Sequence, residues 1–150
     1  MINVRQKGAS GEREIAVALE AIIRKVMVAG GFPTPITPIV QRNQNQSAVG
    51  GSDLTNTFGL AIEVKRQENL SVNTWWKQCE ASASRNSELP VLVYRQSRKP
   101  WKVVQYVWLQ LPNGQHQRHV GEVSWEAFLA WFELWVKGQL NKDGTALLRA

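Results

Sequence analysis

Ser52-Asp53-Leu54-Thr55-Asn56-Thr57-Phe58-Gly59-Leu60-Ala61-Ile62-Glu63-Val64-Lys65-Arg66 is the stretch that decides how this 150-residue chain folds. From Leu60 to Arg66, residues alternate in the pattern of a β-strand whose one face is buried and apolar. The opposite face carries Glu63 and Lys65, two residues apart. Residues 55–59 favour a turn that brings Asp53 back beside Glu63. The stretch therefore predicts two carboxylates and a lysine at the end of a hairpin.

This grouping suits a hard divalent cation. Mg²⁺ binds one or two carboxylates, keeps several water ligands and leaves room for a phosphate oxygen. A lysine beside the ion can orient the attacking water and offset negative charge on the phosphate. A surface Glu–Lys cross-strand pair, worth at most about 1 kcal/mol, would give the same pattern. A third element is needed to choose between the two interpretations.

The third element is a carboxylate in the first predicted helix. Ser10 is the expected N-cap of a helix over residues 11–28. Its apolar residues form one stripe at helical spacing: Ile15, Ala16, Leu19, Ile22, Ile23 and Val26. Glu12 points along this stripe, whereas Glu14 and Glu20 point away from it. Stabilisation of the helix dipole is one explanation for Glu12. A carboxylate aimed at the core is costly unless it is paired or bound to metal, which favours a metal site.

The opening Lys7-Gly8-x-x-x-Glu12-Arg13-Glu14, followed by Asp53 and by Glu63-Val64-Lys65, resembles the archaeal-type Holliday junction resolvases of the PD-(D/E)XK nuclease superfamily, which has phage relatives. The likeness covers about residues 4–108. It implies an α/β fold, with a restriction-endonuclease-like mixed β-sheet flanked by helices. It also implies a catalytic set of Glu12, Asp53, Glu63 and Lys65, in which the three carboxylates hold Mg²⁺ or, as a substitute, Mn²⁺. Two features depart from the family: Ser52 replaces the proline of the superfamily's name, and the segment 30–51 is longer than in the compact archaeal proteins.

The length of the chain predicts one domain over residues 1–150. The resemblance implies a nuclease core at about residues 4–108, and the pattern of the residues after it predicts a C-terminal hairpin and helix at about 109–140. The 18 basic and 12 acidic residues give a net charge of +6, which favours nucleic acid as the partner over an anionic membrane. The sequence has no apolar run long enough to span a bilayer, and its first residues lack the apolar run of a signal peptide. The single cysteine, Cys79, fits a reducing cytosol. The resemblance implies that this is the cytosol of a prokaryote or of a phage-infected cell. We expect no organic cofactor.

Basic residues in several segments are candidates for phosphate contacts. They are Arg5, Lys7, Arg42, Arg66, Arg95, Arg98, Lys99 and Lys102. Residues 5–8 are expected to be mobile. Gln78, in a helix predicted over residues 73–85, is added because in the superfamily a residue of this helix often faces the site. At least one of Trp75 and Trp76 should pack in the core, and base stacking is the alternative role for the other.

The remaining segments predict further elements of the same domain. Strands are expected at residues 39–42, 89–95 and 101–108, and Asn113-Gly114 predicts a small hairpin. Residues 43–51 form a loop expected to lie against the acidic site, either wrapping DNA at a branch point or serving as a surface insertion. Ser124 caps a helix to about Leu140, whose aromatic face packs on its own domain or, alternatively, on a second copy. His116 and His119 are expected at the surface, and the tail from Asn141 is expected to fray.

These observations predict a Mg²⁺-dependent endonuclease that hydrolyses phosphodiesters in branched DNA, above all Holliday junctions. Symmetric cutting of a junction needs two active sites, so the function implies a two-fold homodimer. Two alternatives remain open. One is a repair or restriction-type nuclease of the same fold that acts on other DNA. The other is a DNA-binding protein without catalysis, which leaves the position of Glu12 unexplained.

Overall fold

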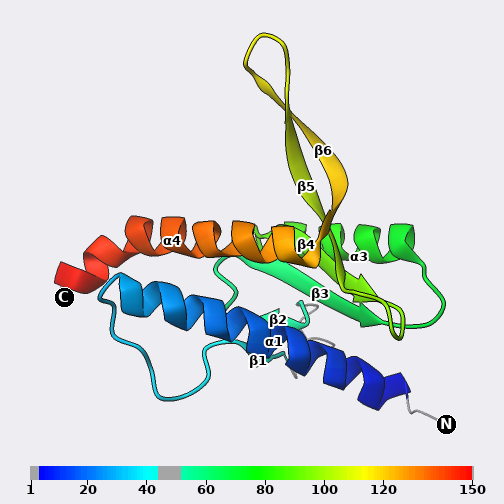
Figure 1. The fold of residues 1–150 in the computed structure, drawn as a ribbon, viewed down its shortest axis with the longest axis horizontal. Helices are drawn as coiled ribbons and strands as arrows, with labels where there is room; N and C mark the ends of the chain where they lie inside the picture. The colour runs from blue at the N-terminus through cyan, green and yellow to red at the C-terminus, as the bar shows by residue number, and fades with distance from the viewer. Residues whose placement is uncertain (1–3, 44–51, 150) are drawn as a thin grey trace.

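A mixed four-stranded sheet, with strand order β3-β4-β5-β6, is the centre of the computed structural model, which describes residues 4–43 and 52–149 (Figure 1). Its strands are β3 (Leu60–Arg66), β4 (Leu89–Arg95), β5 (Lys102–Gln110) and β6 (His116–Ser124). β3 and β4 are parallel, and the other neighbours are antiparallel. A parallel pair requires a crossover connection, which here contains α3 (Val72–Arg85). A separate two-stranded ladder joins β1 (Gln41–Arg42) to β2 (Leu54–Thr55).

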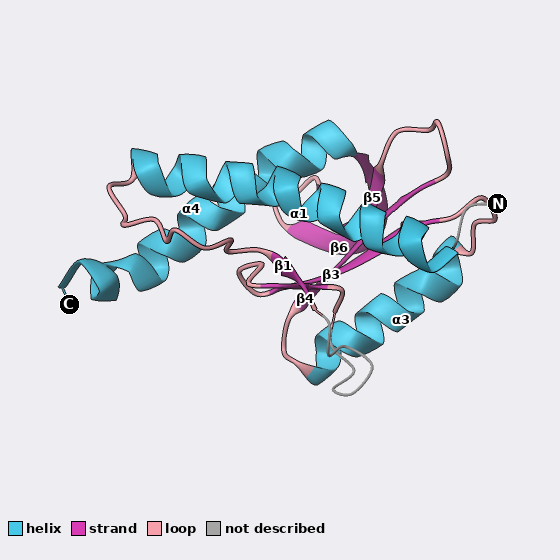
Figure 2. Ribbon diagram, turned by 90° about the horizontal axis from the view of Figure 1, so that it is seen from below, coloured by secondary structure: helices cyan, strands magenta, loops and turns pink. Residues whose placement is uncertain are grey.

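Helices cover both faces of the sheet. α1 (Val4–Ala29) and α4 (Trp125–Arg149) lie together on one face, and α3 lies on the other (Figure 2). Because successive side chains of a strand point to opposite faces, Ile62 and Val64 pack in the core formed with α1 and α4, whereas Leu92 packs with α3. The predicted α/β fold, a mixed sheet between helices, is confirmed, as is the alternation of β3.

The C-terminal helix α4 belongs to the larger of the two cores. Phe128, Phe132 and Val136 are fully buried and cluster with residues of α1 and the sheet. The Ser124 hydroxyl accepts a hydrogen bond from the Ala127 N–H at 3.1 Å, which is the predicted N-cap. The aromatic face therefore packs on its own domain, as expected. Among the described helices, none combines the length and the hydropathy that crossing a membrane would require.

Three expectations about the helix ends are wrong. α1 begins at Val4, so Ser10 lies inside the helix and does not cap it. Gly11 is buried where α1 crosses the sheet, since a Cβ there would lie 3.4 Å from both Arg66 Cβ and the Trp101 indole. The segment around Lys7 is held in place and is not mobile as expected, because the Lys7 ammonium donates to the Glu68 carboxylate at 2.6 Å. At the other end of the chain, α4 continues past Leu140 to Arg149 instead of fraying from Asn141.

The structure also refines three expectations about the hairpin, the two tryptophans of α3 and the strand before the acidic site. The hairpin at Asn113-Gly114 is the tip of a long ribbon, because β5 and β6 each contribute nine residues to it (Figure 1). Trp75 and Trp76 are both buried, at 6% and 8% exposure, which confirms that at least one packs in the core and excludes the alternative role of the other in base stacking. The strand predicted over residues 39–42 is shorter, because only Gln41 and Arg42 pair with β2.

We expect Phe132→Ala to destabilise the protein by about 3–5 kcal/mol, because it empties a fully buried position between α4 and the sheet. The free energy of unfolding in urea measures the effect. Leu134→Ala, in the same helix at a position that is 65% exposed, is the matched control and should change stability by less than about 0.5 kcal/mol. Equal effects of the two substitutions would show that α4 does not contribute to the core in solution.

Candidate active site

Asp53 is held against the open edge of β3 by two hydrogen bonds. Its N–H donates to the Ile62 carbonyl at 3.0 Å, and its carboxylate accepts from the Val64 N–H at 2.7 Å. The side chain is buried, at 4% exposure. The intervening turn reverses the chain through Asn56, Phe58 and Gly59, all at positive φ. The predicted return of Asp53 to the side of Glu63 is therefore present, although β2 itself pairs with β1 and not with β3.

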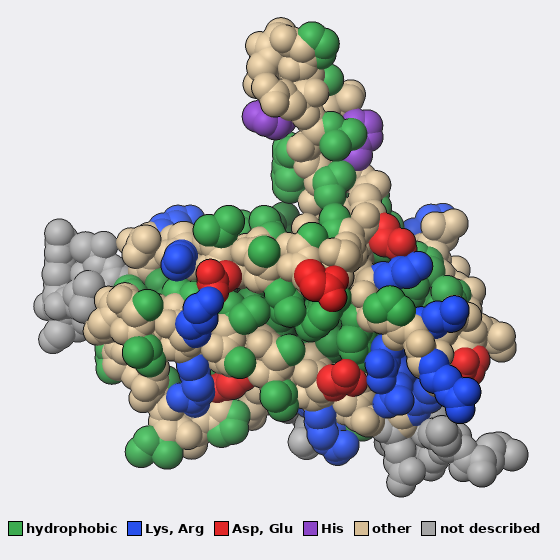
Figure 3. All heavy atoms as spheres, viewed as in Figure 1, with side chains coloured by type: hydrophobic (Ala, Val, Ile, Leu, Met, Phe, Trp, Pro, Cys, Tyr) green, Lys and Arg blue, Asp and Glu red, His purple; other side chains and the backbone are tan. Residues whose placement is uncertain are grey.

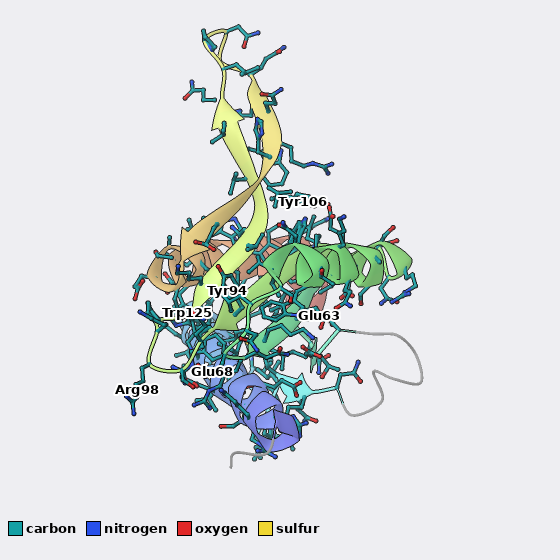
Figure 4. The ribbon with its side chains drawn as sticks, turned by 90° about the vertical axis from the view of Figure 1, so that its right-hand side faces the viewer. Glu63, Glu68, Tyr94, Arg98, Tyr106 and Trp125 are labelled. Atoms are coloured by element: carbon teal, nitrogen blue, oxygen red, sulfur yellow. The ribbon has the colours of Figure 1, made fainter. Side chains whose placement is uncertain are left out.

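Asp53 and Glu63 form a pair of carboxyl groups within hydrogen-bonding reach. The pKa of Glu63 is raised to about 8, mainly by burial and then by the charge of Asp53 and the hydrogen bond with it, while the Lys65 ammonium works in the opposite direction. Two carboxylates this close cannot both ionise easily, so the pair retains a proton near neutral pH. Figure 4 shows Glu63 on the body of the molecule, near α3 and below the base of the β5–β6 ribbon.

Glu12 approaches the same edge from α1. Burial raises the pKa of Glu12, the hydrogen bond from Arg42 lowers it, and the charge of Asp53 raises it again. The Arg42 Nε donates to the Glu12 carboxylate at 2.7 Å, and both side chains are largely buried. Arg42, predicted to bind DNA, therefore neutralises a predicted metal ligand in this structure. The charged pair explains how a carboxylate is tolerated on the apolar stripe.

The face of β3 that bears Glu63 is covered by α3. Lys65 is half-buried two residues further along the strand, on the same side as Glu63. From α3 the buried Cys79 thiol reaches the Ala61 carbonyl at 3.5 Å. Burial, together with the nearby Glu63 carboxylate, raises the pKa of Cys79 to about 12. A protonated buried thiol is a poor nucleophile and a poor ligand, so Cys79 contributes packing. No pattern in the sequence indicates this contact.

A divalent cation fits the Asp53–Glu63 pair, because two converging carboxyl groups that share a proton can exchange it for a metal ion. The predicted cluster of three carboxylates is not assembled as one ligand group. No group of three or more His, Cys, Asp or Glu residues placed to hold a metal occurs among residues 4–43 and 52–149. Glu12 lies near enough to influence both members of the pair, but its carboxylate is engaged by Arg42.

Several residues predicted to contact phosphates are bound within the protein. Lys7 donates to Glu68 and, at 3.2 Å, to the Ser97 hydroxyl. Arg95 lies 3.5 Å from the Glu14 carboxylate and stacks on the Trp101 ring, 4.8 Å from its centroid. These contacts tie the turn after β4 to α1. The phosphate-binding roles of Lys7 and Arg95 would therefore require exchange of their present partners.

Other predicted contacts face solvent. Arg98 and Lys99 are exposed on the turn between β4 and β5, and Lys102 is half-exposed, 3.9 Å from Glu122. Lys99 and Lys102 line a pocket of about 390 Å³ in this turn. Figure 3 shows Lys and Arg side chains gathered at this end of the molecule, where α1 begins. The structure therefore presents a basic surface at the end of the molecule where α1 begins.

The remaining predicted contacts divide into three groups. Arg66 is half-buried at the end of β3, and its Nε has no hydrogen-bond partner in the described part of the chain. Gln78 is exposed on α3, one position from Cys79, which occupies the side facing β3. The side chain of Arg5 and the loop residues 44–51 lie outside the described residues. The ends of that loop are joined, because the Asn43 side chain donates to the Ser52 carbonyl at 3.0 Å.

Comparison with known proteins adds a family. Residues 3–126 match the family described as "Phage putative PDDEXK endonuclease". This match extends beyond Trp108, where the resemblance in sequence was expected to end, and includes the β5–β6 ribbon. The structure is similar to that of Archaeoglobus fulgidus Hjc, a Holliday junction resolvase from an archaeal hyperthermophile, with a TM-score of 0.45 and 17% identity over 83% of this chain and 96% of that protein. No curated protein matches the sequence.

The proton shared by Asp53 and Glu63 makes stability depend on pH. Because Glu63 ionises near 4.5 when unfolded and near 8 when folded, the folded state binds more protons between these values, so stability falls as pH rises through this window. We expect Glu63→Gln to stabilise the protein at pH 8 by about 1 kcal/mol or more relative to its effect at pH 5, where wild-type Glu63 is protonated. Urea unfolding at the two pH values measures this difference.

Glu126→Gln, an exposed acid in the first turn of α4, is the control for a general loss of negative charge and should show no such difference. A Glu63→Gln effect that is the same at pH 5 and pH 8 would contradict the shared proton.

Proposed function

The chain belongs to the phage PDDEXK endonuclease family, and from that premise we propose that it is a Mg²⁺-dependent endonuclease that resolves Holliday junctions. Family membership makes the protein a nuclease with DNA as its substrate. The observation that carries the proposed metal-dependent cleavage is the buried Asp53–Glu63 pair with Lys65 beside it on the same strand. Such a site requires a cation to become fully ionised at neutral pH.

Asp53 and Glu63 would hold the metal ion, and Glu12 would hold a second ion or one of its water ligands. Mg²⁺, or Mn²⁺ in its place, supplies a Lewis acid that polarises the scissile phosphate and lowers the pKa of a bound water. Lys65 orients the attacking water and offsets the charge that develops on the phosphate. The Val64 N–H keeps the Asp53 carboxylate aligned through its 2.7 Å hydrogen bond. Arg42 must release Glu12 for that carboxylate to act as a ligand.

The branched substrate is proposed from the Lys7-Gly8-x-x-x-Glu12-Arg13-Glu14 opening, which resembles the archaeal-type resolvases, and from the basic end of the molecule. Arg98, Lys99 and Lys102 would bind the phosphates of one arm of the junction beside the acidic pair. We place this activity in the cytosol of a prokaryote or of a phage-infected cell. The net charge of +6 supports association with DNA that weakens as salt increases.

We expect the wild-type protein with Mg²⁺ to make paired cuts near the crossover of a labelled four-way junction. Asp53→Asn should slow cleavage about 100-fold or more, because a ligand charge is lost while the oxygen that accepts from Val64 is retained. Lys65→Ala should slow it by about 100-fold or more without weakening junction binding to the same degree. Glu12→Gln should also be slow, whereas Glu14→Gln, two residues along the same helix, is the matched control.

The corresponding linear duplexes, tested at the same salt concentration, separate the substrate from the chemistry. Cleavage of duplex and junction at equal rates would leave a nuclease of the same family and remove the junction. Tight binding with no cleavage in either Mg²⁺ or Mn²⁺ would remove the proposed catalysis.

The proposed reaction also sets an oligomeric state. Symmetric cuts in two strands need two active sites, so the active species is proposed to be a two-fold homodimer. Light scattering at micromolar concentration, with and without junction DNA, should give twice the monomer mass in at least the DNA-bound state. A monomer under both conditions would contradict the dimer and, with it, simultaneous paired cutting.

A further inference from the structure

The ribbon formed by β5 and β6 projects from the body of the molecule (Figure 1). We define its outer part, residues 105–121, as the arm. At its base the Tyr106 ring packs edge-on against Trp76, 5.5 Å between centroids, and Gly121 admits the close approach of Val107. Beyond Val107 almost every arm residue is exposed. Beyond Val107 the arm contributes no residue to the two cores of the described chain or to the proposed active site.

The arm exposes apolar side chains that a protein surface usually covers. Trp108, Leu109 and Val120 are 53%, 54% and 50% exposed. Because all three lie on one projecting ribbon, we interpret them as a contact surface and not as isolated exposed residues. Trp108 pairs with Arg118 across the ribbon, and Arg118 stacks over the Tyr106 ring at 4.3 Å from its centroid. One face of the arm thus presents an aromatic and cationic surface.

The chemistry of the arm selects among partners. Residues 105–121 contain no Asp or Glu, although 12 acids occur in the whole chain. The arm instead carries Arg118, two histidines and a series of side-chain amides: Gln105, Gln110, Asn113, Gln115 and Gln117. Amide groups can donate to and accept from base edges, and a guanidinium group binds phosphate. The arm therefore carries the positive charge of Arg118 and no acidic residue that would repel a polyanion.

The shape and position of the arm suit duplex DNA. A two-stranded ribbon fits the major groove, which is about 12 Å wide and about 8.5 Å deep, and the arm beyond Tyr106 reaches on the order of 15 Å. In the sheet, Glu63 is aligned with Leu92, Val104 and Glu122. Alternation along β5 therefore places Tyr106, at the base of the arm, on the same sheet face as Glu63, where it packs against Trp76 of α3. Figure 4 shows Glu63 on the body of the molecule below Tyr106 and the arm.

We infer that the arm is a second DNA-binding element, which lies in a groove of a duplex segment next to the cleavage site. This inference rests on the proposed function, because it takes the DNA of that same site as its ligand. Arg118 contacts the phosphates at the groove edge, Trp108 and Val120 contact sugars and base edges, and the amides at the tip contact the bases. The arm then adds a DNA contact to those that the acidic pair and the basic turn are proposed to make.

Binding of a fluorescently labelled four-way junction, measured by anisotropy over a salt series in the Asp53→Asn background, tests the inference without cleavage. In one variant Asn-Gly replaces residues 108–118, so that a tight turn joins Val107 to His119, which are paired in the ribbon. This variant should bind about tenfold or more weakly. Arg118→Ala should weaken binding and reduce the slope of log Kd against log salt by about 0.9. Lys137→Ala, which removes an exposed charge from α4, is the matched control.

Junction binding by both arm variants with the wild-type affinity and salt slope would overturn the inference, even if the wild-type protein cleaves junctions. Conversion of a dimer to a monomer by the shortened arm would also overturn it, because the arm would then be an interface between copies. Circular dichroism and thermal unfolding check the fold of the shortened variant, and the Arg118→Ala result decides the matter if that variant does not fold. Absence of cleavage by the wild type would instead count against the proposed function, because the arm is tested by binding alone.

Discussion

The hydrogen bond from the Val64 N–H to the Asp53 carboxylate links the fold of this protein to its chemistry. β3 is an edge strand of the four-stranded sheet, so its outer backbone groups need partners from elsewhere. Asp53 satisfies two of them, with its own N–H bound to the Ile62 carbonyl and its carboxylate bound to Val64. The segment before β2 is thereby fixed along β3. The same two bonds place the Asp53 carboxylate beside Glu63.

Burying these two neighbouring carboxyl groups lowers the stability of the protein when no cation is bound. Burial and the neighbouring Asp53 charge raise the pKa of Glu63, so the pair keeps a proton that isolated carboxyl groups would lose. Glu12 avoids the same penalty by binding Arg42. A cation competes with the proton for the carboxyl pair. It would therefore bind more tightly as pH rises towards 8, because fewer protons would have to be displaced. This destabilising pair is the reason why we propose metal binding at the edge of β3.

Apolar surface is distributed in two contrasting ways in the C-terminal part of the chain. α4 buries Phe128 and Phe132 against α1 and the sheet, and this burial makes the helix part of the main core. The ribbon that immediately precedes α4 exposes Trp108 and Leu109. Both segments are rich in apolar residues, and only the tertiary structure separates the one that stabilises the fold from the one that remains exposed.

The sequence by itself determined the elements whose signals are local. Neighbouring residues set four such features: the alternation of β3, the apolar stripe of α1, the Ser124 cap and the turn between Asp53 and Glu63. These features and the family could therefore be predicted from the sequence. Long-range contacts decided the rest. The start of α1 at Val4, the pairing of Arg42 with Glu12 and the covering of β3 by Cys79 depend on residues that lie 18 to 61 positions apart in the chain. Periodicity does not encode such contacts, since they arise only when packed elements bring distant side chains together.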